Sequence, residues 1–241
     1  MKSGDMLLQA ECVSKYFNKK KVIFIGDGDA ISVCMIYLYK RGLLKYSPSE
    51  VRVLDFDERV IYSIKQFAKA HGLTKELDAE LYNVADKIDK RHWRDFEAFY
   101  TNPPFGASNN GKSIEAFIHR GIEAVTKDGL GVIVLADHID YPWTQNVLSS
   151  IQKYILKNGF MVSELMPNCH HYHLEDAPNL TSCNLMIRRV NFKHKSYSSK
   201  QLEKLHLENF YGSDNPLKVK YVRDLTVAGK LVSRDHYLES F

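Results

Sequence analysis

Several features that would place this chain in a special class are missing from its sequence. It has no run of about 20 apolar residues of the kind that spans a bilayer, and its hydrophobic content of 44% is too high for a disordered chain. Its four cysteines include no CxxC pair, so neither a disulfide framework nor a standard zinc motif is indicated. Repeats and low-complexity segments are absent too. What remains is a globular protein of 241 residues with room for a sizeable core.

The chain also lacks a strong charge of either sign. Its 33 basic and 29 acidic residues leave a net charge of +4, which neither requires a nucleic-acid partner nor excludes one. The first seventeen residues carry acids and no apolar run of signal-peptide character, so a cytoplasmic location is expected.

Apolar runs and amphipathic stretches alternate along the sequence. Strands are predicted at 22–26, 51–56, 79–84, 97–101, 131–136, 160–166 and 183–190. Helices are predicted at 5–17, 29–41, 58–72, 113–125 and 143–159. This order predicts an α/β fold with a mostly parallel seven-stranded sheet and helices on both faces. We expect residues 1–190 to form this Rossmann-like domain, with 1–20 as a leading helix, and 191–241 to form an appendage or tail.

A glycine-containing turn follows the first predicted strand, where open α/β sheets bind their ligands. It reads Gly26-Asp27-Gly28-Asp29, with glycines that let a ligand approach the backbone. We expect Asp29 to begin the next helix as its cap. The full GxGxxG pattern is absent, and two carboxylates would repel a phosphate. The turn therefore favours a cationic ligand such as a sulfonium or an amine, with Gly26 and Gly28 beside it.

Acidic and amide side chains follow the next two predicted strands. Asp55 ends the second strand, where a carboxylate can bind both hydroxyls of a ribose. Asp57 is expected to cap the following helix. Asn83 and Asp86, after the third strand, are candidates for the exocyclic amine of an adenine, although a polar loop explains them equally well.

The most specific motif is Asn102-Pro103-Pro104-Phe105, after the fourth predicted strand. Two prolines fix the backbone and remove both N–H donors, which leaves a rigid loop with exposed carbonyls. The Asn102 amide and the Pro103 carbonyl would grip the hydrogens of a nucleophilic nitrogen, and the Phe105 ring would shield it. Pro104 is expected on the substrate side. The nitrogen's lone pair would then point at an electrophilic carbon.

These motifs resemble those of class I S-adenosylmethionine-dependent transferases over roughly residues 21–190. NPPFGASNN looks like the corresponding stretch of adenine-N6 RNA methyltransferases. A second resemblance is to the branched-chain polyamine synthases, whose catalytic domain has a Gly-Asp-Asp-Asp turn and a D-P-P motif. VLDFDERV (53–60) is similar to that family's second strand.

The second resemblance implies aminopropyl transfer from decarboxylated S-adenosylmethionine to a polyamine, with Asp27 and Asp29 near the reacting amine. Carboxylates there would repel the carboxylate of S-adenosylmethionine and attract the amine of its decarboxylated form. Three features depart from the family pattern. Gly28 stands where the family has Asp, the loop motif begins with Asn102 rather than Asp, and this chain reaches its first strand by residue 21, before which the family has a further domain.

A histidine-rich segment, Cys169-His170-His171-Tyr172-His173-Leu174-Glu175-Asp176, follows the sixth predicted strand. If it is extended, Cys169, His171 and His173 share one face and could bind a metal with Cys183 or Glu175. No standard ligand spacing is present, so a lid loop without metal is the favoured interpretation. The expected substrate-binding residues of such a lid are His171, His173, Glu175 and Asp176, together with His138 after the fifth strand.

Three functions stay open on the sequence. The favoured one is an aminopropyltransferase-like enzyme that takes decarboxylated S-adenosylmethionine as co-substrate and a small polycationic amine as acceptor. The alternative is an adenine-N6 methyltransferase that uses S-adenosylmethionine on RNA or DNA. The third is a nucleoside-binding module without catalysis, against which the NPPF motif counts. No membrane partner is expected, and the oligomeric state, with a dimer among the options, stays open.

Overall fold

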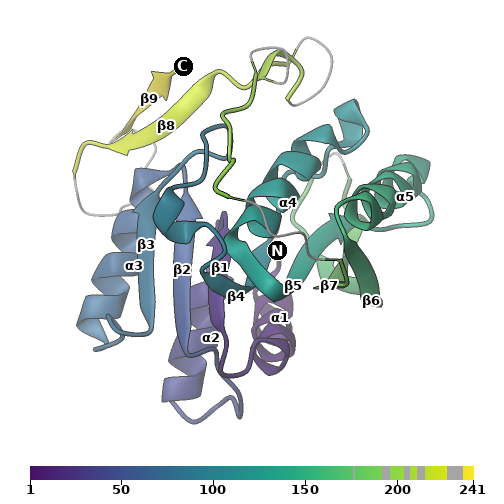
Figure 1. Ribbon diagram of the computed structural model, residues 1–241. Coiled ribbons are helices and arrows are strands. Elements are labelled where there is room, and N and C mark those ends of the chain that lie inside the picture. Colours follow the sequence, from purple (N-terminus) through teal and green to yellow (C-terminus); the bar gives the residue numbers. More distant parts are fainter. Residues whose placement is uncertain (176, 192–195, 204–206, 211–214, 227–235) are drawn as a thin grey trace.

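The computed structural model (Figure 1) describes the chain except residues 176, 192–195, 204–206, 211–214 and 227–235. The helices are α1 (Ser3–Tyr16), α2 (Ile31–Lys40), α3 (Glu58–Ala70), α4 (Lys112–Ala124) and α5 (Pro142–Lys157). The strands are β1 (Lys21–Ile25), β2 (Glu50–Asp55), β3 (Leu77–Leu81), β4 (Phe96–Thr101), β5 (Val125–Ala136), β6 (Phe160–His171), β7 (Thr181–Arg189), β8 (Val219–Asp224) and β9 (His236–Ser240).

Seven of the described strands form one sheet in the order β3-β2-β1-β4-β5-β7-β6. Strands β1 to β5 pair in parallel, and β7 pairs antiparallel with both β5 and β6. The chain order reverses between β1 and β4, so the ends of β1, β2 and β4 meet at one switch point. The predicted α/β fold with a mostly parallel seven-stranded sheet is confirmed.

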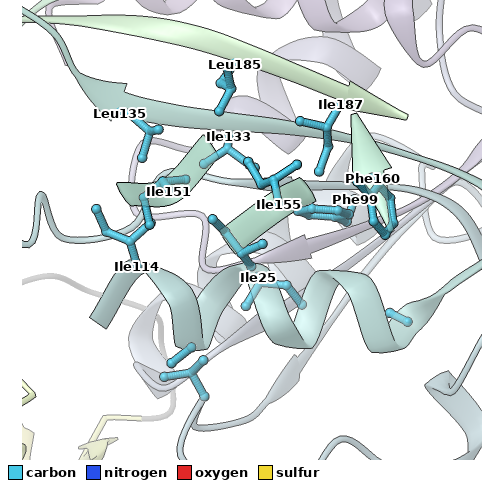
Figure 2. Packing of buried hydrophobic residues seen from close by; sticks show 14 of the residues in the cluster. Ile25, Phe99, Ile114, Ile133, Leu135, Ile151, Ile155, Phe160, Leu185 and Ile187 are labelled. Carbon is cyan, nitrogen blue, oxygen red and sulfur yellow. The ribbon is translucent and has the colours of Figure 1, made fainter. Parts of the chain in front are cut away.

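Side chains of the inner strands alternate between two hydrophobic layers. Val22 and Phe24 pack with α1, α2 and α3 on one face of the sheet. Ile23 and Ile25 pack with α4 and α5 on the other face. Figure 2 shows this second layer, in which Ile114 of α4 and Ile151 and Ile155 of α5 meet apolar side chains from the sheet. Apolar side chains on both faces explain why the inner strands are continuous apolar runs.

The segment after β7 packs on the body of the molecule. The Tyr197 hydroxyl donates to the Ile88 carbonyl at 2.6 Å, and the Leu202 N–H donates to the Ala85 carbonyl at 2.8 Å. Phe210 and Leu217 are buried in the layer that contains α4 and α5. The β8–β9 hairpin lies beside α3, beyond the end of β2 (Figure 1), where the Val222 N–H donates to the Phe56 carbonyl. Phe210, Leu217 and Val222 therefore contribute to the switch-point end of the sheet.

None of the helices in the described part of the chain is long and apolar enough to cross a membrane.

Candidate active site

The turn between β1 and α2 is fixed by its first aspartate. The Asp27 carboxylate accepts hydrogen bonds from the N–H groups of Ile31 at 2.9 Å and Ser32 at 3.2 Å, and from the Ser32 hydroxyl. Asp27 is buried, and this burial raises its pKa to about 8 against the lowering effect of those hydrogen bonds. Asp27 therefore caps the amino-terminal end of α2 from inside the protein.

The expectation that Asp29 caps this helix is wrong. The residue before α2 is Ala30, in the left-handed region at φ 54°, and Asp27 supplies the capping oxygens. Asp29 instead accepts a hydrogen bond from Asn102 Nδ2 at 2.5 Å. The Met1 nitrogen lies 3.1 Å from the other Asp29 oxygen. Asp27 is thus buried and holds the start of α2, whereas Asp29 is part-buried and contacts the NPPF motif.

A cavity of about 230 Å³ lies at the switch point, between the ends of β1, β2 and β4. Gly26, at φ 77°, and Gly28 line it, and their place beside a ligand stays a prediction. Its walls are mostly apolar, and the residues that form them beyond the glycines and polar groups are Ile25, Leu54, Phe56, Val60, Tyr82, Val84, Pro104, Phe117, Phe210 and Leu217. A cavity of this kind suits a planar, mostly apolar ligand with a few polar anchors.

Asp55 is the buried carboxylate of this cavity. Its two oxygens accept the N–H groups of Asp27 at 3.0 Å and Asp57 at 2.9 Å, and burial raises its pKa. Each carboxylate oxygen can accept a second hydrogen bond, so both can still bind hydroxyl groups of a ligand. Asp57 accepts from the Arg59 N–H and caps α3, as predicted.

The two candidates after β3 differ in position. Asn83 lines the cavity, but its amide is occupied, because Nδ2 donates to the Lys220 carbonyl at 2.6 Å and Oδ1 accepts the Ala85 N–H at 2.9 Å. Asp86 is not among the cavity-lining residues, and it binds the hydroxyl of Tyr221 at 3.1 Å. Asn83 therefore binds Lys220 and Asp86 binds Tyr221, and the contact of both side chains with an adenine stays a prediction.

The NPPF loop is anchored to the strand beside it. The Thr101 hydroxyl donates to the Ile25 carbonyl at 2.8 Å, so the end of β4 is tied to the end of β1. Asn102 and Pro104 then line the cavity, while Pro103 is buried. The Phe105 ring meets the Tyr172 ring edge to face, with 5.2 Å between centroids. The motif therefore lies between the cavity and the end of β6.

The prediction that the histidine-rich segment forms a lid loop is wrong for its first part, because β6 continues to His171. The predicted face of Cys169, His171 and His173 turns outward, with His171 paired to Asp5 at 3.1 Å and His173 exposed. Glu175 is exposed too, and Asp176 lies outside the described residues. His138 accepts the Asp140 N–H and meets the Tyr141 ring edge to face, in the loop before α5. Among the described residues of this set, none lines the cavity.

No group of three or more His, Cys, Asp or Glu side chains in the described parts of the chain is arranged to hold a metal ion. Cys169 donates to the Met166 carbonyl at 3.1 Å, and His171 contacts Asp5, so the face they share with His173 is occupied by other contacts.

The sequence prediction missed the residues on the opposite face of the same segment. His170 and Tyr172 alternate with the predicted side chains and are buried. Both bind Ser182 of β7, at 2.7 Å from His170 Nδ1 and 2.9 Å from the Tyr172 hydroxyl. The strict alternation of an extended segment is a signal that could have divided it into two faces.

Comparison with solved structures places this sheet and switch-point cavity in the class I methyltransferase fold. A putative RNA methyltransferase from Pyrococcus horikoshii superposes with a TM-score of 0.52 and 15% identity, over 78% of this chain and 82% of the other. The branched-chain polyamine synthase of Thermus thermophilus, crystallised with N4-aminopropylspermidine and 5'-methylthioadenosine, gives 0.64 and 22%, over 82% and 59%.

The particular family follows from the sequence comparison. The model of the branched-chain polyamine synthase A C-terminal domain matches residues 15–225, so the chain belongs to that family. The N(4)-bis(aminopropyl)spermidine synthase of Thermus thermophilus is 27% identical over 153 residues, which are 64% of this chain and 40% of that protein. An uncharacterised protein of Methanocaldococcus jannaschii is 27% identical over 188 residues, 78% of this chain and 42% of that protein. The chain thus spans about two fifths of the length of these curated relatives.

Proposed function

We propose that this chain transfers an aminopropyl group from decarboxylated S-adenosylmethionine to an amine nitrogen of a polyamine. The observation that carries the proposal is the Asp29 carboxylate, 2.5 Å from Asn102 of the NPPF motif at the edge of the cavity. Family membership supports it, since two curated relatives are named N(4)-bis(aminopropyl)spermidine synthase.

The cavity is the proposed donor site. Asp55 would accept hydrogen bonds from the ribose hydroxyls with the lone pairs that the backbone leaves unused. Phe117, Phe210 and Leu217 would pack on the purine ring. The 5'-methylthioadenosine bound in the related crystal structure is the nucleoside part of such a donor.

Asp29 is the proposed basis of donor choice. A carboxylate beside the donor tail would repel the carboxylate of S-adenosylmethionine and attract the ammonium group of the decarboxylated form. Asp29 is part-buried, so water screens this interaction less than at an open surface. Asp27 would contribute indirectly, because its cap on α2 fixes the path of the turn.

The proposed reaction is a direct displacement. The acceptor nitrogen attacks the methylene carbon bonded to the sulfonium, a C–N bond forms, and the C–S bond breaks with its electron pair moving to sulfur. The leaving group is neutral 5'-methylthioadenosine, and the new ammonium releases one proton. Asn102 Oδ1 and the Pro103 carbonyl would orient the nitrogen, and Asp29 would accept the proton, because an alkyl amine with a pKa of about 10 must be neutral to react.

Calorimetry with the purified chain tests the donor assignment. Decarboxylated S-adenosylmethionine should bind at least about 10-fold more tightly than S-adenosylmethionine. The Asp140→Ala variant, which removes an exposed carboxylate at the same end of the sheet, should keep this preference. Tighter binding of the carboxylated donor would instead favour the methyltransferase alternative.

A further inference from the structure

A network of buried hydrogen bonds leads to the NPPF motif, and the proposed reaction does not use it. It begins at the Tyr172 hydroxyl, 2.9 Å from Ser182 Oγ, which lies 2.7 Å from His170 Nδ1. His170 Nε2 lies 2.8 Å from Gln9 Oε1 of α1. Gln9 Nε2 in turn donates to Asn184 Oδ1 at 2.8 Å and to the Tyr100 hydroxyl at 3.3 Å. A buried network of this kind fixes the orientation of every member when all its polar atoms are paired.

The hydrogen positions in this network can be assigned by starting from Gln9. Gln9 Nε2 is a donor, so Gln9 Oε1 accepts, and His170 carries its hydrogen on Nε2. His170 Nδ1 then accepts from the Ser182 hydroxyl, and Ser182 Oγ accepts from the Tyr172 hydroxyl. This arrangement requires neutral His170, and burial, its largest effect, lowers the pKa of His170 to about 4. Each residue of this network therefore donates its hydrogen to the next one, from Tyr172 through Ser182 and His170 to Gln9.

At the other end of this network, Tyr172 contacts the NPPF motif. The Tyr172 ring packs edge to face on Phe105 of this motif, with 5.2 Å between centroids. Burial raises the pKa of Tyr172 to about 12, and the interactions of its hydroxyl with Ser182 and Asn102 lower it. Asn102 Nδ2 also donates to Asp29 at 2.5 Å. Asp29 and the Tyr172 hydroxyl therefore both interact with the Asn102 side chain. The oxygen of Asn102 is left for a ligand at the cavity, which Asn102 lines.

We propose that Tyr172, Ser182 and His170 are positioning residues, which hold the Asn102 amide with its oxygen toward the acceptor nitrogen. The proposal rests on the proposed function for its catalytic consequence, because the nitrogen that Asn102 orients is the nucleophile of that reaction. The role is specific to the orientation of one amide. It predicts a loss of turnover with little change in donor binding, since neither Tyr172 nor His170 lines the donor cavity.

Tyr172→Phe tests this role, because it keeps the ring against Phe105 and removes only the hydroxyl. The matched control is Tyr16→Phe in α1, which removes a hydroxyl that lies 3.4 Å from Ser163 of β6, away from the site. We expect kcat for 5'-methylthioadenosine release to fall about 10- to 100-fold in Tyr172→Phe, with the KM for the donor within about twofold of the original. Tyr16→Phe should stay within about twofold in both.

Two further variants separate positioning from general stability. Ser182→Ala removes the link and should lower kcat as Tyr172→Phe does. His170→Asn keeps an acceptor near the Nδ1 position and should retain more activity than His170→Leu, which has none. Equal kcat in Tyr172→Phe and the original protein would overturn the proposal. So would equal losses in His170→Asn and His170→Leu.

A spectroscopic measurement separates this proposal from the proposed function. The ¹⁵N NMR signals of His170 should report the neutral Nε2–H tautomer at pH 7, and the side-chain NH₂ signals of Asn102 should shift in Tyr172→Phe but not in Tyr16→Phe. Unshifted Asn102 signals, or a hydrogen on His170 Nδ1, would contradict the positioning role whatever the enzyme does. Absence of aminopropyl transfer by the original protein, with the expected NMR signals, would count against the proposed function alone.

Discussion

The proposed site has two halves, a donor half at the cavity around Asp55 and an acceptor half at Asp29 and Asn102, and these halves satisfy their polar groups in different ways. In the donor half, Asp55 and Asp27 accept hydrogen bonds from N–H groups of the adjoining turns and of α2. In the acceptor half, Asp29, Asn102 and Tyr172 contact one another through their side chains. The donor half is therefore built mainly by the backbone, and a side chain changed there alters shape and stability. The acceptor half is built by side chains, and a change there alters chemistry.

The largest expected effect is that of Asp29→Ala in the acceptor half. The variant removes the proposed proton acceptor and one partner of Asn102, so kcat for 5'-methylthioadenosine release should fall about 10²- to 10⁴-fold. The free energy of unfolding, measured with urea, should change little, because Asp29 is only part-buried. Asp140→Ala serves as the control. An Asp29→Ala variant that retains most of its turnover would remove the distinction between the two halves.

The next effect is the pH dependence of stability through His170. Its pKa falls from 6.5 to about 4 on folding, so the unfolded chain binds a proton between those values that the folded protein does not. The contribution of neutral His170 to the free energy of unfolding is therefore fully present above pH 6.5. It is lost as the pH falls from 6.5 toward 4, by about 1.4 kcal/mol per pH unit within that window. The nearby Asp5 and Asp29 favour the proton, while His171 and the amino terminus oppose it.

Urea unfolding of the original protein and of His170→Asn at pH 5 and 7.5 measures this contribution. The original protein should lose more stability at pH 5 than the variant, because Asn does not titrate. Identical pH dependence in the two proteins would show that His170 is not held neutral.

A smaller effect is expected for Asp27→Ala in the donor half. Loss of the cap leaves the N–H groups of Ile31 and Ser32 without an acceptor, at a cost of about 1–2 kcal/mol in the free energy of unfolding. Turnover of the folded protein should fall much less than in Asp29→Ala. Urea unfolding and turnover measured on both variants provide the comparison. Loss of turnover equal to that of Asp29→Ala, without loss of stability, would instead place Asp27 in the chemistry.

The smallest effect is expected for Gly28→Asp at the rim of the cavity. A Cβ at Gly28 would meet no atom within 4 Å, so the change should leave the fold intact. The added carboxylate should weaken binding of S-adenosylmethionine relative to its decarboxylated form by about 3-fold, which calorimetry measures. Gly28→Asn, with the same shape and no charge, should not change this ratio.

How far the sequence predicted the site follows the same division. The alternation of strands and helices and the positions of Gly26 and Asp55 at strand ends were accessible, because apolar runs, a glycine turn and a carboxylate after a strand are local patterns. The contact between Asp29 and Asn102 joins residues 73 positions apart, and the one between His170 and Gln9 joins residues 161 apart. The first contact depends on the parallel pairing of β1 with β4, and the second depends on the pairing of β6 with β7 and the place of α1. No local pattern in the sequence contains this information. The prediction therefore chose His171 and His173, which are exposed, rather than His170 and Tyr172, which alternate with them and are buried.

The most direct test of the central claim is mass spectrometry of the products formed by the purified chain. Incubation with spermidine and decarboxylated S-adenosylmethionine should yield 5'-methylthioadenosine and a polyamine heavier by one aminopropyl group. S-adenosylmethionine in place of that donor should yield neither product. Methylated products with S-adenosylmethionine, and no transfer from the decarboxylated donor, would contradict the account.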